Sequence, residues 1–257
     1  MVKVNTENYK LFENFISKTD DTYVFNGETS IEGAGVLIEV LKDMGLNPMK
    51  TEDLKKGVFF LFNIEVINMP DFENGRFILT PNHVSDLDAI ILGLLHRKIR
   101  IVSKTDWTNN EKLRQFLDLH YNVYGFDRSS FQSLRDLLTD SISYFNESDE
   151  NRHYLIFSQG TISDFNNNSL ERISRTAQII SNKTGVPIVN MFIEQASLHA
   201  PTRIVFDEPR ILSKDDDFPK IWLERELFLQ NSLNPPARIP KLSHKHSNNN
   251  KPGDPFF

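Results

Sequence analysis

Three ionisable side chains lie at one junction of the sequence, within the stretch LTPNHVSDLDAIILGLL at residues 79–95. His83 follows a short apolar run, and Asp86 and Asp88 come just before a second apolar run. A partly desolvated imidazole, which titrates near pH 6.5, can take a proton from a hydroxyl group, and a carboxylate on its second nitrogen fixes the tautomer. His83 and Asp88 are therefore candidates for a general base and the group that orients it.

The spacing of this pair constrains the local structure. On one regular helix, residues five apart point about 140° away from each other, because each residue advances by about 100°. His83 and Asp88 can meet only if His83 lies in a loop and the helix begins after it, which Pro81 and Ser85 favour as breaker and cap. The alternative interpretation is that Ser85 or Asp86 caps the helix and His83 is a polar loop residue.

Helical and strand-like patterns alternate along the rest of the chain. Apolar spacing predicts helices at 30–48, 85–98, 109–120, 131–147, 169–185 and 218–233, and strands at 57–69, 76–82, 99–104, 121–127, 153–160, 186–194 and 202–212. This order predicts an α/β fold with a mostly parallel central sheet flanked by helices. We expect a small N-terminal helical cap at 1–56, the main α/β domain at 57–234, and a loose tail rich in Pro and Asn at 235–257.

Polar residues follow each of the predicted parallel strands. They are Asn82 to Asp88 after one strand, Lys104 after the next, Asp127 and Arg128 after a third, and Ser158, Gln159, Gly160 and Thr161 after a fourth. Chemistry in open α/β sheets usually occurs where strands end, so these side chains form one candidate site. The alternatives are a surface ion pair for Arg128, a solvated charge for Lys104 and a turn glycine at Gly160.

Composition excludes several classes of function. Among 257 residues, 39% are hydrophobic and 25% charged, and the formal charge of −6 provides no general basic field for nucleic acid. The absence of cysteine excludes disulfides, thiol nucleophiles and cysteine-ligated metals, and the HKH at 244–246 lies in the predicted loose tail. We therefore expect neither a nucleic-acid partner nor a metal site.

The chain has no apolar run long enough to span a bilayer, and its first 15 residues do not resemble a signal peptide. These features predict a cytoplasmic location. Contact with the inner membrane face stays open, because a peripheral protein needs only an apolar or basic face, such as the N-terminal segment or the run GVFFLF at 57–62.

Four blocks in order resemble the glycerolipid acyltransferases of the lysophosphatidate and glycerol-3-phosphate acyltransferase superfamily. The blocks are NHVSDLD with its HxxxxD pattern, YGFDR, FSQGT and VPIVNMFI, and the resemblance covers about residues 60–210. It implies an acyltransferase that moves a fatty acyl group from a thioester of coenzyme A or acyl carrier protein onto a hydroxyl of a glycerophosphate, lysolipid, sugar or related polar acceptor. No tightly bound cofactor is implied.

The resemblance also implies roles for individual residues. His83 would be the general base and Asp88 would orient it. The substrate-binding set would be Lys104, Arg128, Ser158, Gln159, Gly160 and Thr161, with Arg128 and Lys104 on an acceptor phosphate and backbone N–H groups of the QGT turn on an oxyanion.

The third block departs from the family pattern FPEGTRS, because Gln159 replaces the glutamate and Ile162 replaces the arginine. Ile162 removes a permanent charge from the acceptor region, while Gln159 could hold a sugar or glycerol hydroxyl. Two other functions therefore stay open: a catalytically silent lipid-binding or scaffold relative, and a hydrolase of acyl thioesters. The cationic run HRKIR at 96–100 could meet a carrier protein, coenzyme A phosphates or anionic lipid.

Overall fold

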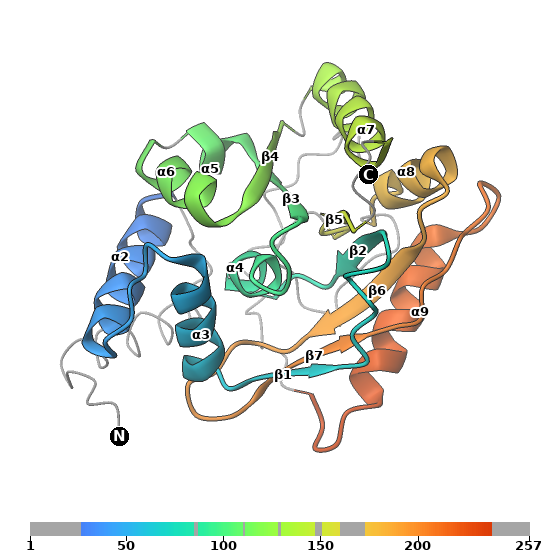
Figure 1. The fold of residues 1–257 in the computed structure, drawn as a ribbon. Coiled ribbons are helices and arrows are strands. Elements are labelled where there is room, and N and C mark those ends of the chain that lie inside the picture. The colour runs from blue at the N-terminus through green and yellow to red at the C-terminus, as the bar shows by residue number, and fades with distance from the viewer. Residues whose placement is uncertain are drawn as a thin grey trace, which may run out of the picture.

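A computed structural model describes residues 27–84, 87–109, 111–127, 130–146, 151–159 and 173–237. Seven strands form one sheet in the order β1-β7-β6-β2-β5-β3-β4 (Figure 1). The strands are β1 (Ile64–Ile67), β2 (Phe77–Pro81), β3 (Ile99–Lys104), β4 (Asn122–Phe126), β5 (His153–Leu155), β6 (Ile188–Ile193) and β7 (Thr202–Phe206). The helices are α2 (Gly27–Asp43), α3 (Thr51–Leu61), α4 (Leu87–Gly93), α5 (Thr105–Asn109), α6 (Glu111–His120), α7 (Phe131–Asn146), α8 (Thr176–Thr184) and α9 (Phe218–Asn231).

The sheet is mostly parallel. Strands β6, β2, β5, β3 and β4 run in one direction, β7 pairs antiparallel with β6, and β1 pairs parallel with β7. The predicted α/β class is therefore confirmed. The carboxyl ends of the five parallel strands meet at one edge, so the described polar positions that follow β2, β3, β4 and β5, such as His83, Lys104, Asp127 and Gln159, gather there.

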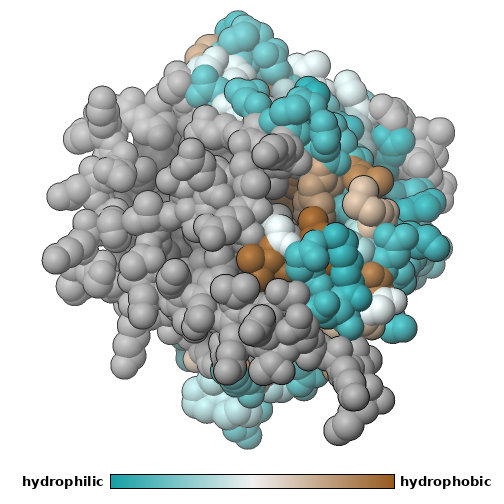
Figure 2. Space-filling view, turned by 90° about the vertical axis from the view of Figure 1, so that its left-hand side faces the viewer, coloured by the Kyte–Doolittle hydropathy of each residue, from teal (hydrophilic) through white to brown (hydrophobic). Residues whose placement is uncertain are grey.

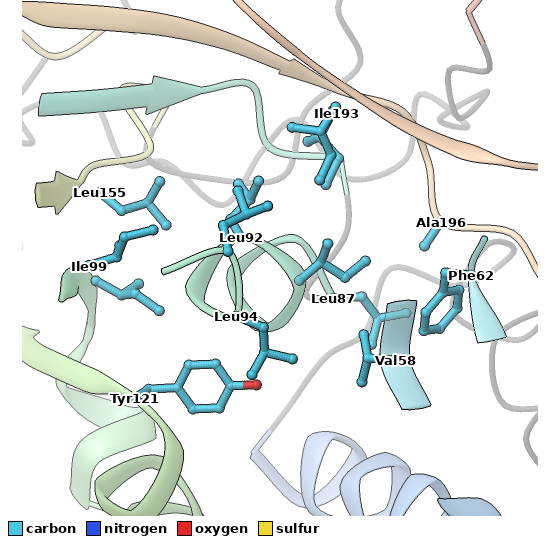
Figure 3. Packing of buried hydrophobic residues seen from close by; sticks show 14 of the residues in the cluster. Val58, Phe62, Leu87, Leu92, Leu94, Ile99, Tyr121, Leu155, Ile193 and Ala196 are labelled. Carbon is cyan, nitrogen blue, oxygen red and sulfur yellow. The ribbon is translucent and has the colours of Figure 1, made fainter. Parts of the chain in front are cut away.

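Helices cover both faces of the sheet because neighbouring strand residues point to opposite sides. Leu79, Leu155 and Val189 pack with residues of α2, α3 and α4, whereas the preceding residues Ile78, Tyr154 and Ile188 pack with α7, α8 and α9. Helix α4 lies in the middle of the first cluster, and Leu94, directly after the helix, lies beside Tyr121 (Figure 3). This packing fixes the helix that carries Asp88.

Several predicted elements differ in the structure. The strand predicted at 57–69 is confirmed only for Ile64–Ile67, which form β1, because 57–61 completes α3 and buries Leu54, Gly57, Val58 and Leu61 at helical spacing. Helix α4 ends at Gly93 rather than near 98, and the short helix α5 was not predicted. The proposed boundary at 56/57 thus falls inside α3. The division into cap, main domain and tail stays a prediction, and 238–257 lie outside the described residues.

The run HRKIR lies at the amino end of β3, at the sheet edge opposite to the gathered polar positions. Two of its charges have protein partners, whereas Arg97 is exposed: the Arg100 guanidinium binds both oxygens of Asp140 at 2.6 and 2.8 Å, and Lys98 Nζ donates to Asn151 at 2.6 Å. His96 Nε2 lies 3.5 Å from a Glu73 oxygen. These contacts give Lys98 and Arg100 structural roles, and contact of the run with a carrier protein, coenzyme A phosphates or anionic lipid stays a prediction.

Across the described ranges, none of the helices combines the length and the apolar composition needed to cross a bilayer. On the side of the molecule that carries α2, α3 and α6, teal side chains border a small brown area (Figure 2). Phe60 of α3 is 65% exposed, in contrast to the buried Val58 and Leu61 of the same helix. The GVFFLF run thus packs mainly inward and leaves one aromatic ring outside.

The amino edge of the sheet contains a buried histidine that should make stability depend on pH. Burial, aided by His96, lowers the pKa of His153 to about 3 from 6.5, and its Nε2 donates to the Phe72 carbonyl at 3.1 Å. Between these values the unfolded chain binds a proton that the folded chain does not, so stability falls as pH falls, by up to about 1.4 kcal/mol per unit. We expect His153→Phe to show a smaller stability loss than wild type between pH 7 and pH 5 in urea unfolding. An unchanged pH dependence would contradict this assignment.

The packing of α4 gives a second stability prediction. A Cβ at Gly93 would lie 2.6 Å from both Ile101 Cδ1 and a Tyr121 ring carbon, whereas a Cβ at Gly35 of α2 would meet nothing within 4 Å. We expect Gly93→Ala to lower the free energy of unfolding by about 1–2 kcal/mol, because overpacking outweighs the gain in helix propensity. Gly35→Ala, the matched control, should raise it by up to about 1 kcal/mol. Equal effects of the two variants in thermal unfolding would refute the packing argument.

Candidate active site

The loop after β2 brings His83 and Asp88 together. His83 Nδ1 lies 3.1 Å from Asp88 Oδ2, and the same oxygen accepts the Val84 N–H at 2.7 Å. His83 lies before α4 rather than within it, which is the geometry that the five-residue spacing requires. Asp88 therefore holds the ring of His83 and also the backbone that follows it.

Burial of this pair differs between its two members. The Asp88 side chain is 0% exposed and the His83 side chain 15% exposed. Because a carboxylate only accepts hydrogen bonds, its contact assigns the proton to Nδ1 of the neutral ring. The other nitrogen, Nε2, makes no hydrogen bond within the described part of the chain, so its lone pair is available to an incoming donor.

Asn82 ties the same loop to β6. Its side-chain Nδ2 donates to the Ile193 carbonyl at 2.9 Å, its Oδ1 accepts the Ile193 N–H at 2.7 Å, and its own N–H donates to the Met191 carbonyl at 3.2 Å. The residue is fully buried. This side chain continues the β2–β6 pairing beyond the last strand residue, a role that the sequence did not reveal beyond placing a polar residue at the strand end.

The segment after β5 lies on the other side of His83. The ring of Phe157 stacks on the imidazole with centroids 4.1 Å apart, and the Gln159 side-chain oxygen accepts the His83 N–H at 2.6 Å. Gln159 was predicted to contact substrate, and Phe157 was given no role. A backbone N–H needs only an acceptor oxygen, and the side chains of glutamine and glutamate both provide one. This explains how glutamine can replace the glutamate of the family pattern.

Ser158 is also buried, and its Oγ has no hydrogen-bond partner in the described ranges, while its carbonyl accepts the Ser174 N–H at 2.8 Å. That contact ties the segment after β5 to the approach to α8. Its predicted role in substrate binding stays a prediction.

The remaining predicted residues are placed only in part. Lys104 ends β3 and pairs with Phe126 of β4, so its backbone lies at the expected edge, but its side chain is outside the described part. Arg128, Gly160 and Thr161 lie outside the described residues. At about 4.8 Å per strand, β3 and β4 lie roughly 10 and 14 Å from β2, so residues after them could bind a substrate group at that distance from His83.

A buried ion pair follows β6 at the same edge. Arg203 Nε and an Nη atom donate to the two carboxylate oxygens of Glu194 at 2.8 and 2.6 Å, and these hydrogen bonds raise the pKa of Arg203. Because the pair satisfies both charges, it braces β6 and β7 rather than offering a free charge to substrate. Among the described side chains, no three His, Asp or Glu residues are arranged to hold a metal ion.

Comparisons with known proteins show the family and the fold of the chain. The family described as Acyltransferase matches residues 63–194, which is slightly more than half of the chain. The crystal structure of the 1-acyl-sn-glycerophosphate (LPA) acyltransferase PlsC from Thermotoga maritima is similar, with a TM-score of 0.51 and 14% identity over 89% of this chain and 98% of that one. At this identity the similarity shows a shared fold. A search of curated proteins gives no significant match.

The matched region contains β2, the His83 loop, α4, the segment after β5 and β6, and therefore Asp88, Phe157 and Gln159, which contact His83. The resemblance seen in the sequence is confirmed, and the chain belongs to the acyltransferase family.

Proposed function

We propose that this acyltransferase moves a fatty acyl group from an acyl thioester to a hydroxyl of a glycerophosphate, lysolipid or related polar acceptor, with His83 as general base oriented by Asp88. The observation that carries the proposal is the 3.1 Å contact between His83 Nδ1 and Asp88 Oδ2, which supports Nε2 as the nitrogen that accepts the proton of a substrate hydroxyl. Positioned general bases contribute about 10²–10⁴-fold to such reactions.

The reaction needs one proton transfer in each direction. His83 Nε2 takes the proton of the acceptor hydroxyl as its oxygen attacks the thioester carbonyl, forming a tetrahedral oxyanion. The intermediate then collapses with cleavage of the C–S bond, and the imidazolium returns the proton to the thiolate. The products are an oxygen ester and a thiol, with no covalent enzyme intermediate.

Burial of Asp88 supports this role. The imidazolium formed during the reaction would be stabilised by a carboxylate that is fully shielded from water, where electrostatic attraction is stronger than at the surface. Phe157 covers one face of the ring and limits the access of water to the base. The geometry thus gives the ring one fixed tautomer and one open nitrogen.

The nature of the substrates is inferred more indirectly. The substrate named for PlsC and the polar positions after β3, β4 and β5 support a glycerophosphate-like acceptor, with Lys104 and Arg128 on its phosphate. Backbone N–H groups at Gly160 and Thr161 would bind the oxyanion. The donor would be a coenzyme A or acyl carrier protein thioester, and no tightly bound cofactor is required.

A cytoplasmic protein with peripheral contact at the inner membrane face would meet such lipids. The exposed ring of Phe60 supports that contact, because an aromatic side chain on the outside of a helix can enter the interface of a bilayer.

Loss of the base tests the proposal directly. His83→Ala should lower the rate of acyl transfer by about 10²–10⁴-fold, because the base that removes the proton of the substrate hydroxyl is lost. The circular dichroism spectrum should stay unchanged. The assay would incubate acyl-CoA and acyl-ACP with glycerol phosphate, lysophosphatidate and sugar acceptors, and analyse products by mass spectrometry. His199→Ala, at an exposed histidine, is the matched control.

Each other outcome points to a different function. Full activity in His83→Ala would contradict the base assignment. Release of free fatty acid without an ester product would indicate a thioester hydrolase, and binding of lipid without turnover by wild type would indicate a silent relative.

The orienting carboxylate gives a separate prediction. Asp88→Asn leaves a neutral amide beside Nδ1, so we expect the imidazole to populate the Nε2–H tautomer and kcat to fall about 10²–10⁴-fold. Nitrogen-15 NMR of the His83 ring measures the tautomer independently of turnover. Asp118→Asn on the exposed side of α6 should change neither quantity. An Nδ1–H tautomer that persists in Asp88→Asn would show that Asp88 does not set it.

A further inference from the structure

Three consecutive backbone N–H groups around His83 are each held by a different element. The Asn82 N–H donates to Met191 of β6 at 3.2 Å, the His83 N–H to Gln159 Oε1 at 2.6 Å, and the Val84 N–H to Asp88 Oδ2 at 2.7 Å. The first bond continues the β2–β6 ladder and the third is local to the loop. The second is a side-chain contact across 76 residues of sequence to the histidine itself.

The donor in the His83–Gln159 contact determines which atom of the Gln159 amide faces His83. A backbone N–H can only donate, so the Gln159 atom that faces it is the carbonyl oxygen of the amide. Gln159 is 2% exposed, so an apolar side chain of similar size in its place would leave the His83 N–H shielded from water. The His83 N–H would then be buried without a partner, or the loop would move to satisfy it.

We propose that Gln159 is a positioning residue for the acyl transfer, and that it fixes the backbone from which the His83 ring projects. The inference rests on the proposed function, since it assigns Gln159 to the base rather than to the acceptor. Asn82 and Asp88 fix the loop before and after His83, and Gln159 fixes it at His83 from the side of β5. The imidazole is thereby placed relative to Asp88 on α4 and to Phe157.

The role differs measurably from acceptor binding. A residue that binds the acceptor equally in the ground and transition states changes KM, whereas a residue that places the base changes kcat. Displacement of a catalytic group by about 1 Å can cost roughly 10²-fold in rate. The two roles therefore separate in steady-state kinetics with the acceptor as varied substrate.

Gln159→Leu and Gln159→Glu form a matched pair of similar size. Leucine has no acceptor oxygen, so we expect kcat to fall roughly 10–100-fold with an acceptor KM within about threefold of wild type. Glutamate keeps an oxygen for the His83 N–H and should stay closer to wild type than leucine. Gln159→Asn keeps the amide but is one methylene shorter, so it should also lower kcat, and it serves if the leucine variant does not fold.

The outcomes separate this inference from the proposed function. A raised KM with unchanged kcat in Gln159→Leu or Gln159→Asn would identify Gln159 as an acceptor-binding residue and overturn the inference. An unchanged kcat per folded molecule in Gln159→Leu would show that the contact with the His83 N–H is only structural, and would also overturn the inference. His83→Ala is assayed in parallel: if that variant is active, the proposed function itself fails, whereas an inactive His83→Ala with a fully active Gln159→Leu refutes only the positioning role.

Discussion

The site depends on one carboxylate oxygen, Asp88 Oδ2, which accepts hydrogen bonds from the ring of His83 and the backbone of Val84. A buried carboxylate is costly unless hydrogen bonds compensate for lost water, so the His83 ring and the Val84 N–H are constrained to stay in place. The cost is met because α4 is anchored: Ile91 and Leu92 are fully buried beneath the strands and fix the turn that carries Asp88. Packing of the helix and geometry of the base are thus one constraint.

Contacts on both sides of this loop depend on strand order. Strand β2 lies between β6 and β5, so the loop that leaves β2 has a partner on each side at the carboxyl edge. Asn82 uses β6 and His83 uses the segment after β5. The side chains that make these contacts, Asn82 and Gln159, are neutral amides, so they bind backbone groups without adding a charge near Asp88 and His83.

Ion pairs brace several elements of the described structure. The buried pair Arg203–Glu194 follows β6, Arg225 binds both oxygens of the buried Asp207 at 2.7 Å, and the half-buried Arg100 pairs with the half-buried Asp140. Removing one member of such a pair would leave an uncompensated charge, so these residues are constrained by stability alone. A charged residue that forms such an ion pair is therefore not by itself evidence of a catalytic role.

Local sequence determined the features that short-range physics controls. The alternation of helical and strand-like patterns indicated the α/β class, and the spacing of His83 and Asp88 with a break between them indicated how they could meet, because both depend on residues close in the chain. Only the first part of the strand predicted at 57–69 was wrong: 57–61 are helical, since a short apolar stretch fits a buried helix or a strand equally well until its neighbours are known.

Only the tertiary structure decided which oxygen holds the His83 N–H and which strand binds Asn82. Gln159 is 76 residues from His83 and Ile193 is 111 residues from Asn82. Such contacts depend on strand order and register, and a polar residue at a strand end is equally suited to substrate, solvent or another loop. The sequence determined that these polar groups gather at one edge, and the folded sheet determined which of them serve the base.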